Sequence, residues 1–112
     1  MSAQPSIATL VAAGGAKIPA TTVVRNGQLV NVVSAEIYPA DVAIFENTVV
    51  AIGDVTPYFG DETIEIDAGG RYLVPGLFDG HQHLECSKLS ITSIAKMLVP
   101  LGTTNVVSGL DQ

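Results

Sequence analysis

Val74-Pro75-Gly76-Leu77-Phe78-Asp79-Gly80-His81-Gln82-His83 is the stretch of this chain that says most about its fold. It contains both histidines of the 112 residues, two positions apart, at the end of an apolar run. A strand is expected over residues 77–84, and side chains at i and i+2 of a strand share one face. Two neutral imidazoles on one face form half of a site for a first-row metal. The alternative is a pair of histidines on a polar strand face that holds no metal.

The residues before this stretch indicate a domain of short strands. A short helix is expected over residues 6–13, ended by Gly14-Gly15. The dipeptide Asn26-Gly27 predicts a two-residue hairpin turn, and a second hairpin is expected around Glu46-Asn47. The expected strands cover residues 21–25, 28–33, 36–38, 41–45, 48–52, 63–67 and 71–74. Short strands with frequent turns are typical of a β-sandwich, and these would supply half of one.

The pattern changes at Pro75-Gly76. The strand expected over 77–84 is followed by Ser90, a suitable N-cap for a helix over about 91–99. Residues 103–108 are apolar and β-branched, as in a buried parallel strand. Strand, helix and strand in this order predict one βα unit and the strand that follows it.

The run from Asp67 to His83 resembles the beginning of the barrel in the amidohydrolase superfamily, whose members are metal-dependent hydrolases and deaminases. There, Pro-Gly, two hydrophobic residues, Asp-x and His-x-His end the first barrel strand. Within the superfamily the chain is similar to the amino-terminal part of the adenine deaminase family. The residues that carry this likeness are 26–44, 81–85 and 100–104.

The resemblance implies a mixed β and α/β fold in three parts. Residues 1–20 are an N-terminal segment with a short helix, and residues 21–75 are a portion of a small, composite β-sandwich. Residues 76–112 are the first βαβ segment of a TIM-type (β/α)8 barrel. A complete barrel needs about 250 residues, so the chain is expected to be the amino-terminal piece of a longer protein and inactive alone.

In the family, the two histidines of the motif bind metal, which makes His81 and His83 the expected ligands here. The metal is a divalent ion, with Zn, Fe and Mn all suited to His and carboxylate ligands. Metal-activated hydroxide would attack a carbon of a nitrogen heterocycle and either deaminate the ring or open it. For an adenine deaminase the reaction is adenine and water to hypoxanthine and ammonia. The remaining ligands would come from residues beyond 112.

Two carboxylates accompany the histidines and are the candidate catalytic residues. Asp79 and Glu85 share the face of His81 and His83 if strand alternation continues through the motif. One of them is expected to orient a ligating histidine through its second ring nitrogen. The alternative is that both are solvated loop carboxylates. Cys86 is interpreted as a bystander, because hydroxide chemistry needs no thiol nucleophile.

Composition limits the partners and the compartment. The net charge is −6, which argues against nucleic acid and an anionic membrane surface as partners. A single cysteine fits a reducing cytoplasm. Hydrophobic residues make up 47% and charged residues 14%, so part of the apolar surface is expected to be covered. The expected partners are a small heterocyclic substrate, the remainder of the parent chain and further copies in a homo-oligomer. The competing interpretation of function is a non-catalytic assembly or metal-binding module derived from the same fold.

Overall fold

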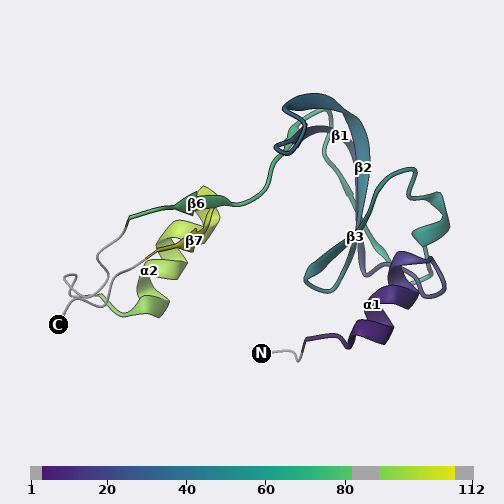
Figure 1. The fold of residues 1–112 in the computed structure, drawn as a ribbon, viewed down its shortest axis with the longest axis horizontal. Coiled ribbons are helices and arrows are strands. Elements are labelled where there is room, and N and C mark those ends of the chain that lie inside the picture. Colours follow the sequence, from purple (N-terminus) through teal and green to yellow (C-terminus); the bar gives the residue numbers. More distant parts are fainter. Residues whose placement is uncertain (1–3, 82–88, 108–112) are drawn as a thin grey trace. The chain divides into compact units, whose positions relative to one another are not determined.

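The computed structural model describes residues 4–81 and 89–107 (Figure 1). The chain divides into two compact units, Met1–Val74 and Pro75–Gln112. The described parts form a mixed β-sheet, a smaller parallel strand pair and few helices. Within these parts, no helix is both long enough and apolar enough to cross a lipid bilayer.

The first unit begins with helix α1 (Ile7–Gly14). Ser6 caps this helix, because its side-chain oxygen accepts a hydrogen bond from the backbone N–H of Thr9 at 3.1 Å. The predicted helix, ended by the two glycines, is confirmed.

Five strands follow and form one sheet. Its order is β3-β2-β1-β4, and β5 also pairs with β1. Neighbours β1–β2 and β2–β3 are antiparallel, whereas β4 and β5 run parallel to β1. The bounds are β1 (Thr22–Asn31), β2 (Glu36–Phe45), β3 (Thr48–Gly53), β4 (Ile64–Asp67) and β5 (Tyr72–Leu73), with a 3-10 turn at Thr56–Tyr58 between β3 and β4. The hairpin predicted around Glu46-Asn47 is confirmed.

The hairpin predicted at Asn26-Gly27 is wrong, because β1 runs straight through this dipeptide. Asn26 has a φ of 61°, and the pairing register with β2 shifts between Val24 and Gly27. An asparagine with positive φ therefore serves a β-bulge here, where the same dipeptide often serves a turn. The chain reverses later, at residues 32–35.

The strands predicted at 36–38 and 41–45 form the single strand β2, which includes Pro39. On one side of β2, Pro39 pairs with Gln28 of β1. On the other side, β3 pairs in the described sheet with residues Asp41–Phe45 of β2 and does not extend to Pro39. Pro39 thus lies where the other side of β2 is a sheet edge, the position in a sheet that tolerates a missing N–H.

One face of this sheet holds the core of the first unit. The buried cluster consists of Ala20, Val23, Ala43 and Val55, against which Val50, Ala51 and Tyr58 pack. The Tyr58 hydroxyl donates to the carbonyl of Gly14 at 2.7 Å and so ties the 3-10 turn to α1. Helix, turn and sheet are therefore held around one small aliphatic centre.

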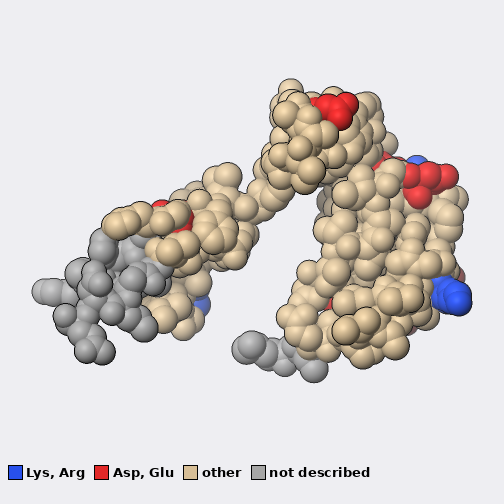
Figure 2. Space-filling model, viewed as in Figure 1, with Lys and Arg blue, Asp and Glu red and all other residues tan. Residues whose placement is uncertain are grey.

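The opposite face is apolar but partly bare. Strand pairing aligns two rows of residues across four strands, and side-chain alternation places them away from Val23 and Ala43. The rows are Ile52, Val42, Val24 and Ile66, and Val49, Ile44, Thr22 and Ile64. At the ends of the rows, Ile52 is 54% exposed and Ile64 is 62% exposed. Neither row contains a charged residue. The charged side chains that Figure 2 shows form small patches on a largely uncharged visible surface.

The second unit is a strand-helix-strand segment. Strand β6 (Leu77–Asp79) pairs in parallel with β7 (Thr103–Val106), and α2 (Ile91–Leu98) lies between them in sequence. A 3-10 turn (Val99–Leu101) and Gly102, with a φ of 104°, end the helical part. Ile94 is the buried residue of α2. The βα unit predicted from the sequence is confirmed.

Ser90 caps α2 as predicted, since its hydroxyl oxygen accepts from the N–H of Ser93 at 3.1 Å. We expect Ser90→Ala to destabilise the helix by about 1 kcal/mol, because this N–H loses its acceptor. Ser90→Asp retains an acceptor and is the matched control. Circular dichroism during urea unfolding measures the difference; equal stability of Ser90→Ala and the wild type would contradict the cap.

Candidate metal centre

Strand β6 places Asp79 at the carboxyl end of a parallel strand, two residues before His81. Asp79 is the last residue of β6, is half-buried and pairs with Val106 of β7. Its carbonyl accepts a hydrogen bond from the N–H of Val107 at 2.8 Å. In open sheets with parallel strands, ligands bind outside the carboxyl ends of the strands. His81 follows this end directly.

The strand expected over 77–84 is wrong at residues 80 and 81, because β6 ends at Asp79, and residues 82–84 lie outside the described residues. The Asp79 Oδ1 atom accepts a hydrogen bond from the backbone N–H of His81 at 3.1 Å. Such a bond two residues along the chain forms a local turn that competes with continued strand pairing. His81 is therefore an exposed residue beyond the strand, and strand alternation does not set the direction of its side chain.

The structure shows what Asp79 does for one of the two histidines. Its carboxylate fixes the backbone at His81, while its carbonyl keeps the end of β6 attached to β7. His83 and Glu85 lie outside the described residues. Within 4–81 and 89–107, no group of three or more His, Cys, Asp and Glu side chains comes together.

The start of β6 is packed tightly against β7. The N–H of Leu77 donates to the carbonyl of Gly102 at 2.7 Å. A Cβ atom at Gly76 would collide with the side chain of Thr104. A glycine after Pro75 is therefore required for the close approach of β6 and β7. This approach sets the position of Asp79 at the end of β6 and of His81 after it.

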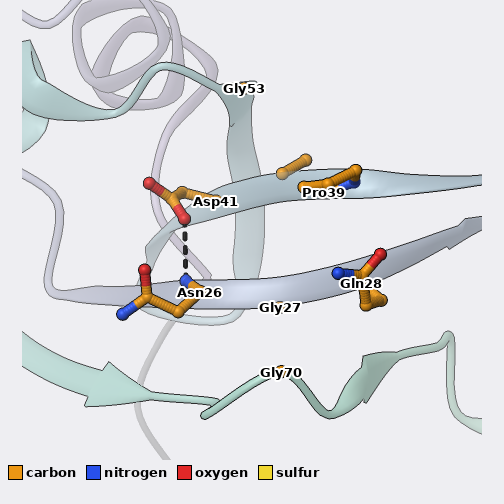
Figure 3. Close-up of a pocket in the computed structure, with 8 residues that line it drawn as sticks. Asn26, Gly27, Gln28, Pro39, Asp41, Gly53 and Gly70 are labelled. Atoms are coloured by element: carbon orange, nitrogen blue, oxygen red, sulfur yellow. Dashed lines mark hydrogen bonds between the residues drawn. The ribbon is translucent and has the colours of Figure 1, made fainter.

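A pocket lies in the first unit, a different unit from the one that contains His81 (Figure 3). It opens at the bulge in β1, where Asp41 of β2 faces Asn26. Asp41 Oδ1 accepts from the N–H of Asn26 at 2.9 Å, and Asp41 Oδ2 lies 3.6 Å from Nε of Arg25. The lining residues are Asn26, Gly27, Gln28, Pro39, Ala40, Asp41, Gly53 and Gly70.

Asn26 extends this network to a second carboxylate, which the sequence interpretation missed. Its Nδ2 donates to Asp67 Oδ1 at 3.1 Å, and Gly69 N–H donates to the same oxygen at 2.8 Å. These bonds, first that from Asn26, lower the pKa of the Asp67 carboxyl below its usual value. The one signal in the sequence was Asn26 itself, an asparagine followed by glycine. Asp41 and Asp67 lie on β2 and β4, the strands on either side of β1 in the sheet.

Comparison with known sequences gives relatives of one kind, although no family model matches the chain. The chain is 60% identical over 104 residues to adenine deaminase 1 of Latilactobacillus sakei, covering 92% of this chain and 18% of that protein. It is 59% identical over 101 residues to adenine deaminase 4 of Rhizobium meliloti, covering 90% and 17% respectively. The chain thus spans less than one fifth of the length of these relatives.

Comparison with solved structures gives the same fold. A D-aminoacylase variant in complex with copper chloride matches 81% of this chain and 19% of its own, with a TM-score of 0.69 and 25% identity. N-acyl-D-glutamate deacylase from Bordetella bronchiseptica, complexed with zinc and a phosphonate inhibitor, matches the same shares with a TM-score of 0.66 and 22% identity.

The mixed sheet and the βα unit match the amino-terminal part of amidohydrolase-superfamily chains such as the D-aminoacylase variant. Its sequence is similar to the amino-terminal part of adenine deaminases. The resemblance stated from the sequence is therefore confirmed.

Proposed function

We propose that the chain forms the amino-terminal part of a metal-dependent hydrolase that deaminates a nitrogen heterocycle, with adenine as substrate and hypoxanthine and ammonia as products. The observation that carries this proposal is the position of His81 two residues beyond the end of β6, with its backbone held by Asp79. The similarity to adenine deaminases over most of the chain supports the reaction class. The test is turnover of adenine by the full-length enzyme, with ammonia release as the readout.

His81 and His83 would hold a divalent metal, and imidazole nitrogen suits Zn, Fe and Mn alike. When bound, such a metal lowers the pKa of its water and supplies hydroxide near neutral pH. His81 is exposed just beyond the carboxyl end of a parallel strand, where ligands of such sheets bind. Glu85 remains a candidate for substrate contact or for orienting a histidine.

Asp79 acts as a positioning residue in this proposal. We expect Asp79→Ala in the full-length enzyme to lower metal affinity by up to about 10-fold, the lower end of what losing a hydrogen-bond partner of a ligand side chain costs, because here the bond is to the backbone of His81. The physical reason is the loss of the acceptor that fixes the His81 backbone. Metal titration monitored by calorimetry measures the change.

Asp79→Asn is the matched control, because its amide oxygen can still accept from the His81 N–H. It should retain more metal affinity than Asp79→Ala. Equal affinity of Asp79→Ala and the wild type would contradict the positioning role.

We include in the same proposal the assignment of the chain to three parts: a helical segment, a portion of a β-sandwich and the start of a barrel. The five-stranded sheet, whose second face is apolar and partly bare, supports a portion of a composite β-sandwich over 21–75. The parallel β6-α2-β7 segment supports the start of a (β/α)8 barrel over 76–112, with 1–20 as the preceding helical segment. A cytoplasmic location is proposed with them.

We further propose that copies of this chain associate through the bare face of the first unit. Two uncharged rows of aliphatic residues leave Ile52 and Ile66 about half exposed, and apolar faces of this kind mark association surfaces. The 11.6 kDa chain should therefore scatter light as an oligomer at micromolar concentration. Ile52→Lys combined with Ile66→Lys should shift it toward the monomer, whereas lysines at the exposed Gln4 and Ser34 should not. A wild-type monomer would contradict this surface.

A further inference from the structure

The dipeptide Asn26-Gly27 combines a reactive sequence with an unusual position. The chain has four asparagines, followed by Gly27, Val32, Thr48 and Val106. Loss of the side-chain amide from asparagine begins with attack by the next backbone nitrogen. Glycine permits this attack best, since it has no Cβ in the way and visits conformations closed to other residues. Asn26 is exposed to the water that completes the reaction.

We propose that Asn26 is a spontaneous deamidation site that the folded sheet restrains, and that its conversion loosens the bulge of β1. In the first step the deprotonated amide nitrogen of Gly27 bonds to Cγ of Asn26. The Cγ–Nδ2 bond breaks, and Nδ2 takes a proton from solvent and leaves as ammonia. Water then opens the five-membered imide ring at either carbonyl. The products are aspartate and isoaspartate, so the balance is one water consumed and one ammonia released.

The restraint comes from hydrogen bonds on three sides of Asn26. Its N–H donates to Asp41 at 2.9 Å, its carbonyl accepts from the N–H of Gly70 at 2.7 Å, and its Nδ2 donates to Asp67 at 3.1 Å. The attack requires rotation of the Asn26 side chain toward the Gly27 nitrogen, which breaks at least the bond to Asp67. Figure 3 shows Asn26 and Gly27 in the strand between Asp41 and the segment of Gly70.

Gly27 limits the motion further. It is buried, and an added Cβ would lie 2.5 Å from the side chain of Leu73. The backbone at Gly27 thus packs directly on β5 and cannot swing out without separating the two strands. Folding should therefore slow the reaction at this site, although the side chain of Asn26 is exposed.

Conversion changes the charges at the bulge. The new carboxylate replaces a donor to Asp67 by a negative group at hydrogen-bonding distance, with Asp41 on the other side. Like charges facing each other across strands are destabilising. The hydrogen bond from Asn26 is the main cause of the lowered pKa of Asp67, and a carboxylate in its place acts in the opposite direction.

Isoaspartate adds a second disturbance. It inserts one extra methylene into the backbone of β1, the strand that pairs with β2, β4 and β5. Pairing on both sides of β1 then loses its register beyond the bulge. Either product should leave the first unit less stable than before, and the change is irreversible without repair.

The first experiment follows amide loss by peptide mapping and mass spectrometry in the complete 112-residue chain at mildly alkaline pH. One sample is folded and one is held in concentrated urea. In urea, Asn26 should convert well before Asn31, Asn47 and Asn105. In the folded sample its conversion should be several-fold slower than in urea. Conversion of the other asparagines at the same rate in urea, or no slowing by folding, would overturn the proposal.

The second experiment measures urea unfolding of variants. Asn26→Asp mimics the aspartate product and should unfold at lower urea concentration than Asn47→Asp, the matched control at the exposed β2–β3 turn. Asn26→Gly accepts the positive φ and cannot deamidate, so its unfolding midpoint should stay constant during alkaline incubation while that of the wild type falls. Equal midpoints for Asn26→Asp and Asn47→Asp would overturn the link between conversion and loosening.

Discussion

Replacement of His81 by Asn in the full-length enzyme is expected to remove nearly all deaminase activity and most of the bound metal. Loss of an outer partner of a metal ligand already costs about 10- to 100-fold, so loss of the ligand itself should exceed about 100-fold. A large effect at His81 is consistent with the structure, because the carboxylate of Asp79 accepts a hydrogen bond from the His81 N–H and so holds its backbone. Metal content by elemental analysis and turnover of adenine are the two measurements.

His83→Asn should have the same effect, because both imidazoles are proposed as ligands of one ion. Gln82→Asn, between the two histidines in sequence, is the matched control and should retain metal and activity. Full activity with normal metal content in both histidine variants would contradict the metal assignment. Loss of activity with normal metal content would shift the proposal from metal binding to another catalytic role for these histidines.

Local chemistry was predictable where one residue decides the local structure. Ser90 caps α2 as its hydroxyl predicts, and Glu46-Asn47 forms the expected turn. The motif after Pro75 was recognisable because its residue order is specific. In each of these cases the interacting groups are close in sequence, so the pattern contains most of the physical cause.

Most of what the sequence did not predict depends on partners that are distant in sequence. Asn26-Gly27 favours a turn locally, but Asp41, Asp67 and Gly70 hold it as a bulge inside β1. The pairing of β4 and β5 with β1 in parallel likewise depends on residues about 40 positions apart. The strand at His81 is the exception, because its cause is local. Asp79 accepts a hydrogen bond from the N–H of His81, this bond competes with strand pairing, and the periodicity of the sequence contains no information on that competition.

Val23 offers the largest expected effect on stability. It is fully buried in the cluster of the first unit and lies in β1, between β2 and β4. Val23→Ala should lower the free energy of unfolding by about 2 kcal/mol through lost packing. Val23→Asp should cost more than about 4 kcal/mol, because a carboxylate in this aliphatic cluster has to be protonated or left without a partner.

Such a loss approaches the whole stability of a small domain, about 5–15 kcal/mol, so Val23→Asp should leave the first unit largely unfolded. Ile64→Asp is the control, since this side chain is 62% exposed and its carboxylate can remain in water. Far-ultraviolet circular dichroism and urea unfolding compare the two variants. If Val23→Asp were no less stable than Ile64→Asp, the core would have to lie on the other face of the sheet, and the apolar rows beginning at Ile52 and Val49 would be its centre.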